Sequence, residues 1–420
     1  MKLNSKLNNI LILVKSHKEI IENYFFMTLL QILNSFFYLL IYPYLIKTLG
    51  SDNYGLFVFI TSIVMYFVFF VNFGFDLPAT KAIALALNDK HEISRILSCI
   101  YTGKVLFFAI SVIVYFLLIF IVPFLYTNKE LAIITFLQII NFVIFPNWYF
   151  QAIQKMKIVT LIQLSCKILT LPLIFLFVKS KNDLIIYATI VSGGFVFGGI
   201  IANIIIVYFH NIKIKFVKLK EIKVWIKDSL PFFLSNSTGI IKEQSVALII
   251  GAFFGMKEVA IYDLANKIVS IPRTLLMSIN GAIFPKLILN IDSTRVKKII
   301  KYEFIISILV ILMIIICGSF IVRVMGGIEM KLAYPLAILL SCSIMSWLIV
   351  GAYINFVFVP NKVSFYAVKN QIVALISFLL VTLIGLLVTK NLMILGVAIC
   401  FSALAEIFYC IYITKKYKFL

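Results

Sequence analysis

The sequence predicts an all-α integral membrane protein with about twelve membrane-spanning helices arranged as two six-helix bundles. Hydrophobic residues make up 63% of the 420 residues and charged residues only 13%, whereas a soluble domain carries roughly 25% charged residues. Apolar stretches of about 20 residues, the length that crosses a bilayer as a helix, recur along the chain. A soluble globule would need a polar exterior, so hydrocarbon must surround most of these helices.

Twelve stretches are long and apolar enough to span a membrane. We expect helices because open strands leave backbone groups unpaired in hydrocarbon, and the alternation typical of a barrel is absent. The predicted spans are residues 22–46, 54–77, 99–122, 131–150, 158–178, 184–209, 230–254, 259–284, 303–324, 332–357, 365–388 and 392–414.

The distribution of Lys and Arg predicts that both termini lie in the cytoplasm. With the N-terminus inside, the inside segments hold 26 basic residues, including the loop at 78–104, and the outside loops hold 8. Cytoplasmic loops carry such an excess in membrane proteins. The bias also explains the net charge of +21 without a nucleic-acid partner. The polar N-terminal segment lacks a signal-peptide core, and we expect it to remain in the cytoplasm.

A basic segment at residues 211–228 separates the predicted bundles, which comprise residues 1–210 and 211–420. Its apolar residues alternate with lysines, a pattern that predicts a cytoplasmic connector in the lipid headgroup layer. A weak repeat supports the division, because Tyr54 precedes Pro78 at nearly the spacing by which Tyr262 precedes Pro285. Two similar halves are a common plan among transporters.

Six ionisable side chains lie near the middle of the fifth and seventh predicted helices or along the eighth, where each would cost at least about 2.5–3.5 kcal/mol if isolated in lipid. They must therefore face water, each other or a ligand. Asp263 and Lys267, four residues apart on one helix, can pair. For Lys267 and Arg273, extension of the side chain towards a membrane interface is the alternative. For Asp76 and Glu406, which lie nearer the cytoplasmic side, we favour a structural role. The six are Lys167, Lys242, Glu243, Asp263, Lys267 and Arg273.

Polar residues also form stripes along three predicted helices, which predicts a water-filled central cavity between the bundles. A polar contact between helices is the alternative for the first stripe. The stripes consist of Thr28, Gln31, Ser35, Tyr38 and Tyr42 on the first helix, of Ser235, Asn236, Thr238, Lys242, Glu243 and Ser245 on the seventh, and of the charged residues of the eighth.

The sequence contains no phosphate-binding glycine-rich loop and no metal-ligand cluster, and its three histidines are far apart. We therefore expect neither ATP hydrolysis nor a bound cofactor. Energy would come from an ion gradient or from removal of product outside. The six cysteines form no CxxC pair and are expected to be small buried hydrophobes.

Four segments resemble the bacterial polysaccharide, or O-antigen, flippases of the multidrug/oligosaccharidyl-lipid/polysaccharide exporter superfamily. They are residues 42–57, 72–81, 145–156 and 260–268. The family often has Gly and Glu where this chain has Ala152 and Gln154, which argues against an acid's role at that point. The resemblance implies a fold like that of the MATE exporters.

The resemblance implies that the chain moves an oligosaccharide linked to undecaprenyl pyrophosphate from the cytoplasmic to the outer leaflet of the bacterial inner membrane, by alternating access. A glycan polymerase and a chain-length regulator are the implied partners. Basic side chains would hold the diphosphate, polar ones the sugar, and acidic ones a coupled proton or sodium ion. These groups are Lys167, Lys242, Lys267 and Arg273; Gln31, Ser235, Asn236 and Thr238; and Glu243 and Asp263.

The sequence argues against two other functions. An ion-coupled multidrug exporter should have a net acidic cavity, whereas the six charges comprise four bases and two acids. A membrane-embedded glycan polymerase usually needs a large outside loop, and all the predicted outside loops are short.

Overall fold

The computed structural model describes the backbone of residues 2–288, 293–363 and 365–420. It describes the side chains of residues 22–23, 25–277, 293–363 and 365–420. Every regular element within these residues is a helix, which confirms the predicted fold class.

The chain folds into two compact units. The first comprises Met1–Phe37, Phe67–Phe177 and Ile185–Phe233, and the second comprises Tyr38–Tyr66, Val178–Leu184 and Leu234–Leu420. Helices α1, α2, α10 and α11 therefore contribute residues to both units. The predicted pair of bundles at 1–210 and 211–420 stays a prediction.

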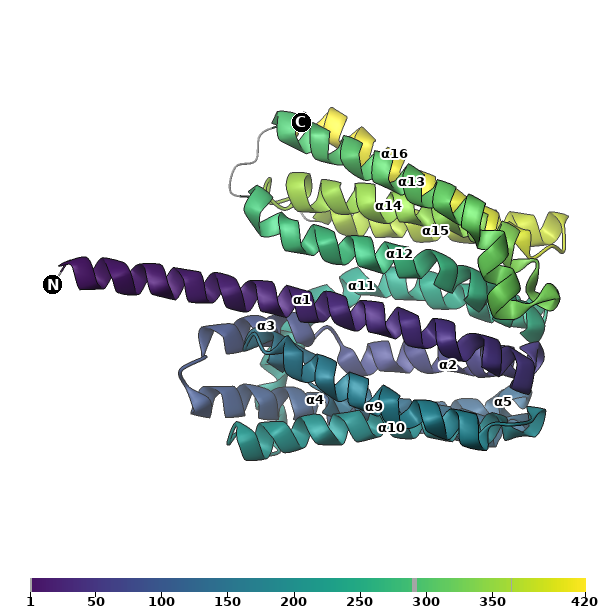
Figure 1. Ribbon diagram of the computed structural model, residues 1–420, viewed down its shortest axis with the longest axis horizontal. Coiled ribbons are helices and arrows are strands. Elements are labelled where there is room, and N and C mark those ends of the chain that lie inside the picture. The colour runs from purple at the N-terminus through teal and green to yellow at the C-terminus, as the bar shows by residue number, and fades with distance from the viewer. Residues whose placement is uncertain (1, 289–292, 364) are drawn as a thin grey trace. The chain divides into compact units, whose positions relative to one another are not determined.

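The first unit contains most of the helices from the first half of the sequence (Figure 1). The elements up to residue 209 are α1 (Lys2–Leu49), α2 (Ser51–Asn72), α3 (Asp76–Leu85), α4 (Lys90–Ile121), α5 (Pro123–Thr127), α6 (Lys129–Phe136), α7 (Gln138–Ile144), α8 (Asn147–Ala152), α9 (Met156–Phe177), the 3₁₀ turn η1 (Lys181–Asp183), α10 (Leu184–Ile204) and the π-helical turn η2 (Ile205–Phe209).

The second unit is built mainly from the later helices, and Figure 1 shows α13, α14, α15 and α16 running alongside one another. The elements after residue 218 are α11 (Leu219–Phe253), α12 (Met256–Ile288), α13 (Ser293–Gly326), the 3₁₀ turn η3 (Ile328–Met330), α14 (Ala333–Tyr353), the π-helical turn η4 (Ile354–Phe358), α15 (Phe365–Val388) and α16 (Met393–Lys416).

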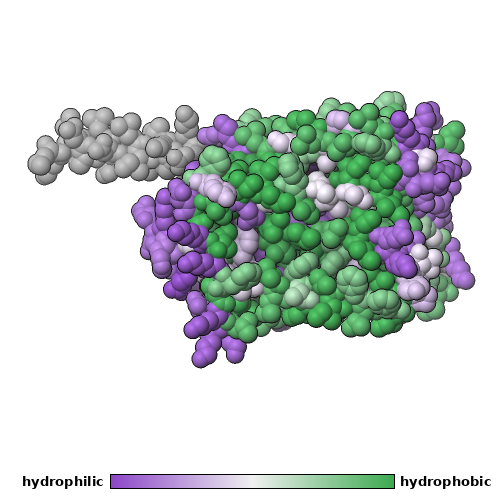
Figure 2. Space-filling view, turned by 90° about the horizontal axis from the view of Figure 1, so that it is seen from below, coloured by the Kyte–Doolittle hydropathy of each residue, from purple (hydrophilic) through white to green (hydrophobic). Residues whose placement is uncertain are grey.

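Ten helical segments among the described residues are long and apolar enough to cross a membrane. They match ten of the predicted spans, and α11 and α12 match the other two. These two helices carry five of the six predicted intramembrane charges, which makes them less apolar than the rest. Figure 2 shows hydrophobic residues over the middle of the helices on one face, with hydrophilic residues towards the helix ends.

The predicted span at 131–150 is not one continuous helix but the series α6, α7 and α8. Pro146 explains the break before α8, because proline lacks a backbone N–H and disfavours a helical conformation in the preceding residue. Phe145 accordingly has extended backbone angles, with φ −96° and ψ 101°. The short α8 packs against α3, where the Thr80 hydroxyl donates to the Trp148 carbonyl at 3.3 Å.

The connector between the two halves of the sequence lies against α4 within the first unit. Residues 211–218 form no helix, and the Lys215 and Val217 backbone amides donate to the hydroxyls of Ser98 and Thr102 at 3.0 and 3.3 Å. The predicted polar tail at the N-terminus is helical from Lys2 onwards.

Candidate functional site

The predicted site residues are divided between the two units. Gln31 and Lys167 belong to the first unit. The other eight, which lie on α11 and α12, belong to the second: Ser235, Asn236, Thr238, Lys242, Glu243, Asp263, Lys267 and Arg273.

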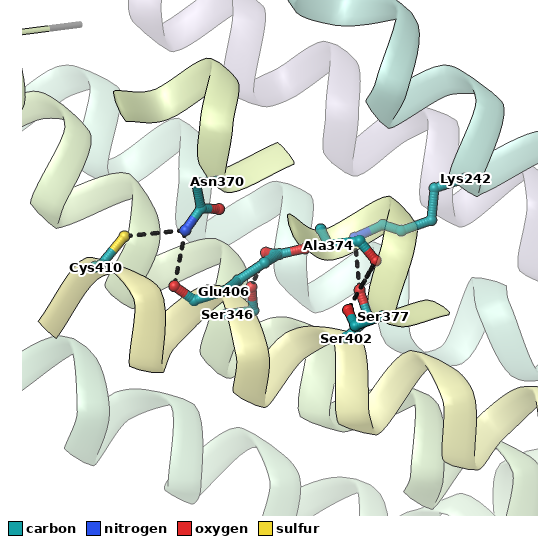
Figure 3. A network of polar contacts seen from close by, with 8 residues as sticks. All are labelled: Lys242, Ser346, Asn370, Ala374, Ser377, Ser402, Glu406 and Cys410. Carbon is teal, nitrogen blue, oxygen red and sulfur yellow. Dashed lines mark hydrogen bonds and ion pairs between the residues drawn. The ribbon is translucent and has the colours of Figure 1, made fainter. Parts of the chain in front are cut away.

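Lys242 forms a tight ion pair with Glu406 on α16 (Figure 3). The Lys242 Nζ lies 2.5 Å from Glu406 Oε1 and 3.4 Å from the Ser402 hydroxyl oxygen. The Glu406 side chain is only 7% exposed, whereas that of Lys242 is 23% exposed. The pair thus joins a nearly enclosed acidic side chain to a partly exposed lysine.

Besides Lys242 of α11, residues of α14 and α15 surround Glu406. The Ser346 hydroxyl of α14 donates to Glu406 Oε2. Asn370 of α15 donates to the Glu406 backbone carbonyl at 2.8 Å and contacts the Cys410 sulfur at 3.2 Å (Figure 3). The sequence predicts a structural role for Glu406. It does not reveal the pair, because Glu406 is 164 residues from Lys242 and sequence patterns reveal neighbours only along one helix.

Arg273 on α12 makes two weaker contacts. One guanidinium nitrogen lies 3.6 Å from a carboxylate oxygen of Glu243 on α11. The guanidinium carbon of Arg273 lies 4.9 Å from the centre of the Trp347 ring of α14, a cation–π arrangement. The Arg273 side chain is 15% exposed and that of Glu243 is 45% exposed. Glu243 is therefore the counter-ion of Arg273, whereas its sequence neighbour Lys242 pairs with α16.

Asp263 of α12 is held by tyrosines. Its Oδ2 accepts hydrogen bonds from the hydroxyls of Tyr38 on α1, at 3.1 Å, and Tyr54 on α2, at 2.9 Å. Lys267 lies over the Tyr38 ring, with its Nζ 5.1 Å from the ring centre. The pairing of Asp263 with Lys267 that the sequence suggested is therefore replaced by a shared contact with Tyr38.

The polar stripe of α11 is accessible in part. Ser235 and Thr238 are half-buried and Asn236 is exposed, while the Ser245 hydroxyl lies 3.0 Å from that of Tyr66 on α2. Hydroxyl and amide groups on one helix can bind the hydroxyls of a sugar.

The first unit contributes separate polar groups. Lys167 of α9 lies over the Phe37 ring at 5.3 Å, and Gln31 on α1 is half-buried. The sequence did not single out Lys104. This residue belongs both to the predicted cytoplasmic loop 78–104 and to the predicted span 99–122, and it was counted with the loop. Lys104 is 2% exposed and donates to Asn72 and Asp76 at 3.0 and 3.1 Å.

Glu406 joins the predicted site as a third acid beside Glu243 and Asp263. With the four bases Lys167, Lys242, Lys267 and Arg273, the set then holds four bases and three acids. The expected excess of bases, which argues against a multidrug exporter, is thus reduced from two to one.

Comparisons with solved structures support the fold alone. The chain is similar to a multidrug resistance MATE family transporter of the MOP superfamily in its inward-facing conformation, with a TM-score of 0.70 and 12% identity over 93% of this chain and 98% of the other. A MATE structure in complex with MaL6 gives a TM-score of 0.58 and 15% identity over 96% of each chain. The fold is therefore MATE-like.

Sequence comparisons identify the family. A protein from Escherichia coli K12, named as a candidate O-antigen transporter, is 30% identical over 66% of this chain and 67% of its own length. A protein of the same name from Shigella dysenteriae is 28% identical over 60% of this chain and 64% of its own. Residues 20–288 match the family model described as polysaccharide biosynthesis protein. This chain therefore belongs to the family of polysaccharide biosynthesis proteins.

Proposed function

We propose that this chain is a flippase, which moves an oligosaccharide linked to undecaprenyl pyrophosphate from the cytoplasmic to the outer leaflet of the bacterial inner membrane. Its family membership and its relatives' names support a transporter of surface-polysaccharide precursors rather than an enzyme. The movement occurs by alternating access, with both termini in the cytoplasm. A glycan polymerase and a chain-length regulator would then take up the product.

The observation that carries this proposal is the incomplete pairing of Arg273. Charge-assisted N–H···O bonds to carboxylates are about 2.7–2.9 Å long, whereas Arg273 and Glu243 are 3.6 Å apart. The guanidinium is thus held in position by Trp347 without being engaged by a short hydrogen bond to Glu243.

A diphosphate is a suitable partner for this incompletely paired guanidinium. A guanidinium presents a planar fork of donors that matches phosphate oxygens in pairs, and it is more weakly hydrated than an ammonium. The substrate's diphosphate would therefore replace Glu243, whose half-exposed carboxylate can be solvated after it is displaced.

The remaining predicted site residues complete the proposal. Further positive charge would come from Lys167, Lys242 and Lys267, while the lipid tail stays in the bilayer. The sugar would be bound by Gln31, Ser235, Asn236 and Thr238. A proton or sodium gradient would drive the step, with Glu243 and Asp263 as the predicted ion carriers.

The test replaces Arg273 in cells whose surface glycan depends on this chain. We expect Arg273→Ala to lower surface glycan about tenfold or more, since a hydrogen bond to a charged group contributes about 1.5–3 kcal/mol. Arg273→Lys should restore only part of it, because an ammonium lacks the planar fork. Arg323→Ala, at an exposed arginine near the end of α13, is the matched control and should leave glycan unchanged.

Membrane levels of each variant, measured on immunoblots, separate lost transport from lost protein. Normal surface glycan with Arg273→Ala at a normal protein level would reject Arg273 as part of the substrate site. Export of a cationic dye by membrane vesicles containing the chain would instead support the multidrug exporter.

A further inference from the structure

The side chains of Lys242 and Glu406 differ in their exposed fractions. The Glu406 side chain is 7% exposed and that of Lys242 is 23% exposed. Lys242 also lies on the polar stripe of α11 that carries Ser235 and Thr238. A ligand that reaches this stripe can therefore contact Lys242 without reaching Glu406.

Glu406 has no second counter-ion among the described residues. Its side chain contacts Lys242 from α11 and the neutral Ser346 from α14. α15 contributes the neutral Asn370, and its own helix contributes Cys410, which lies beside that amide. If an anion drew Lys242 away, a buried carboxylate would retain one hydroxyl as its hydrogen-bond donor.

Such a carboxylate is costly to keep ionised. Burial strongly disfavours the charged form of an acid that has lost its cation, and the group takes up a proton instead. An acceptor without a hydrogen-bond partner in the described structure lies on the side chain that contacts the Glu406 backbone. Asn370 is fully buried, and its Oδ1 has no hydrogen-bond partner within the described part of the chain. A protonated carboxyl has an O–H that can donate to such an atom.

The other two acids among the predicted site residues are placed differently. The Glu243 side chain is 45% exposed, so water can solvate its carboxylate when Arg273 leaves it. Asp263 accepts two tyrosine hydrogen bonds, which do not depend on a cation. Of the three carboxylates, Glu406 alone combines burial with dependence on a single cation.

We propose that Glu406 is a proton-binding site linked to the substrate site: the substrate's diphosphate takes Lys242 from Glu406, and Glu406 takes up one proton from water. Lys242 stays protonated throughout, and the proton returns to water when the ligand leaves and the ion pair re-forms. This inference rests on the proposed function and assigns proton uptake to a residue other than the predicted carriers Glu243 and Asp263.

The proposal predicts a definite pH dependence. Binding that takes up one proton weakens about tenfold for each unit of rising pH, by the linkage between the two binding events. By the same linkage, protonation of Glu406 strengthens diphosphate binding.

The test counts protons on binding by isothermal titration calorimetry of the purified full chain, in two buffers of different ionisation enthalpy. The probe is a farnesyl diphosphate N-acetylglucosamine, a diphosphate diester whose phosphates do not titrate near neutral pH, so any proton goes to the protein. We expect the unmodified protein to take up close to one proton. Glu406→Gln should bind the probe with no uptake and lose the pH dependence.

Three further variants make the result specific. Lys242→Ala should bind more weakly and also show no uptake, because Glu406 is then protonated before the ligand arrives; this variant serves if Glu406→Gln does not fold. Glu243→Gln and Asp263→Asn are the matched controls and should retain the uptake.

Uptake that persists in both Glu406→Gln and Lys242→Ala would overturn the inference, as would uptake lost only in Glu243→Gln or Asp263→Asn. Probe binding by the unmodified protein without proton uptake would reject the inference while leaving the proposed function intact. Failure of the unmodified protein to bind the probe would count against both.

Discussion

Lys104 connects three elements of the first unit. Its ammonium donates to Asn72 at the end of α2, to Asp76 at the start of α3 and to the Phe142 carbonyl of α7 at 3.3 Å. The left-handed Gly74, with φ 70°, makes the turn that places these acceptors together. One buried cation thus fixes the path of the chain between α2 and α3.

We predict that Lys104→Met destabilises the protein by about 1–3 kcal/mol, because it leaves partly buried acceptors without a donor. The contribution of Asp76 to this figure is small, since its side chain is 50% exposed and screened. Thermal unfolding in detergent measures the effect. Lys47→Met, at an exposed lysine near the end of α1, should leave the melting temperature unchanged, and equal melting of both variants would contradict a structural role for Lys104.

The sequence located the charged residues correctly but not their partners. A charge within an apolar stretch is visible in the sequence, so Lys242, Asp263 and Arg273 could be singled out. Their partners Glu406, Tyr54 and Trp347 lie on other helices. Which helices pack together depends on side-chain fit across the fold, and no pattern within one helix encodes it.

At the scale of elements, α2 and α12 approach each other at Gly55. A Cβ built on Gly55 would lie 1.7 Å from the backbone carbonyl oxygen of Met256, a distance that no side chain could tolerate. The same helices are joined by the Tyr54 hydroxyl and Asp263, so the close approach and the tyrosine contacts support one another.

We predict that Gly55→Ala destabilises the protein and lowers its transport, because α2 and α12 must move apart and weaken the hydrogen bonds to Asp263. Gly193→Ala is the matched control, since a Cβ at that position of α10 meets no atom within 4 Å. Alanine there should be neutral or stabilise by about 0.5–1 kcal/mol through helix propensity. Equal melting temperatures for the two variants would refute the close packing of α2 on α12.

The positions of the helices could be read from the sequence, since hydrophobic length sets where a helix crosses a bilayer. The predicted range 365–388 coincides with α15, and 158–178 nearly coincides with α9. Hydrophobic length does not reveal the division of 131–150 into three pieces, although Pro146 lies within that span. A proline's effect on a membrane helix depends on whether neighbouring helices satisfy the freed backbone groups.

At the scale of the whole molecule, the proposed function is the transport of an anionic lipid-linked glycan. Its ionic groups are paired across helices within the second unit, and the pairs differ in burial and length. Outward movement of an anion is favoured by a membrane potential that is negative inside, by about 2.3 kcal/mol per charge for each 100 mV. Cations that can exchange a carboxylate partner for the diphosphate, rather than a fixed excess of positive charge, would then hold the diphosphate transiently and release it.

The most direct test reconstitutes the purified chain into liposomes with a lipid-linked oligosaccharide that carries a fluorescent label on its sugar. Dithionite added outside destroys only the label in the outer leaflet. We predict that the chain exposes the inner-leaflet label to dithionite over time, and that Arg273→Ala slows this exposure. An inner-leaflet label that stays as protected as in protein-free liposomes would contradict the proposal that this protein moves lipid-linked glycans across the membrane.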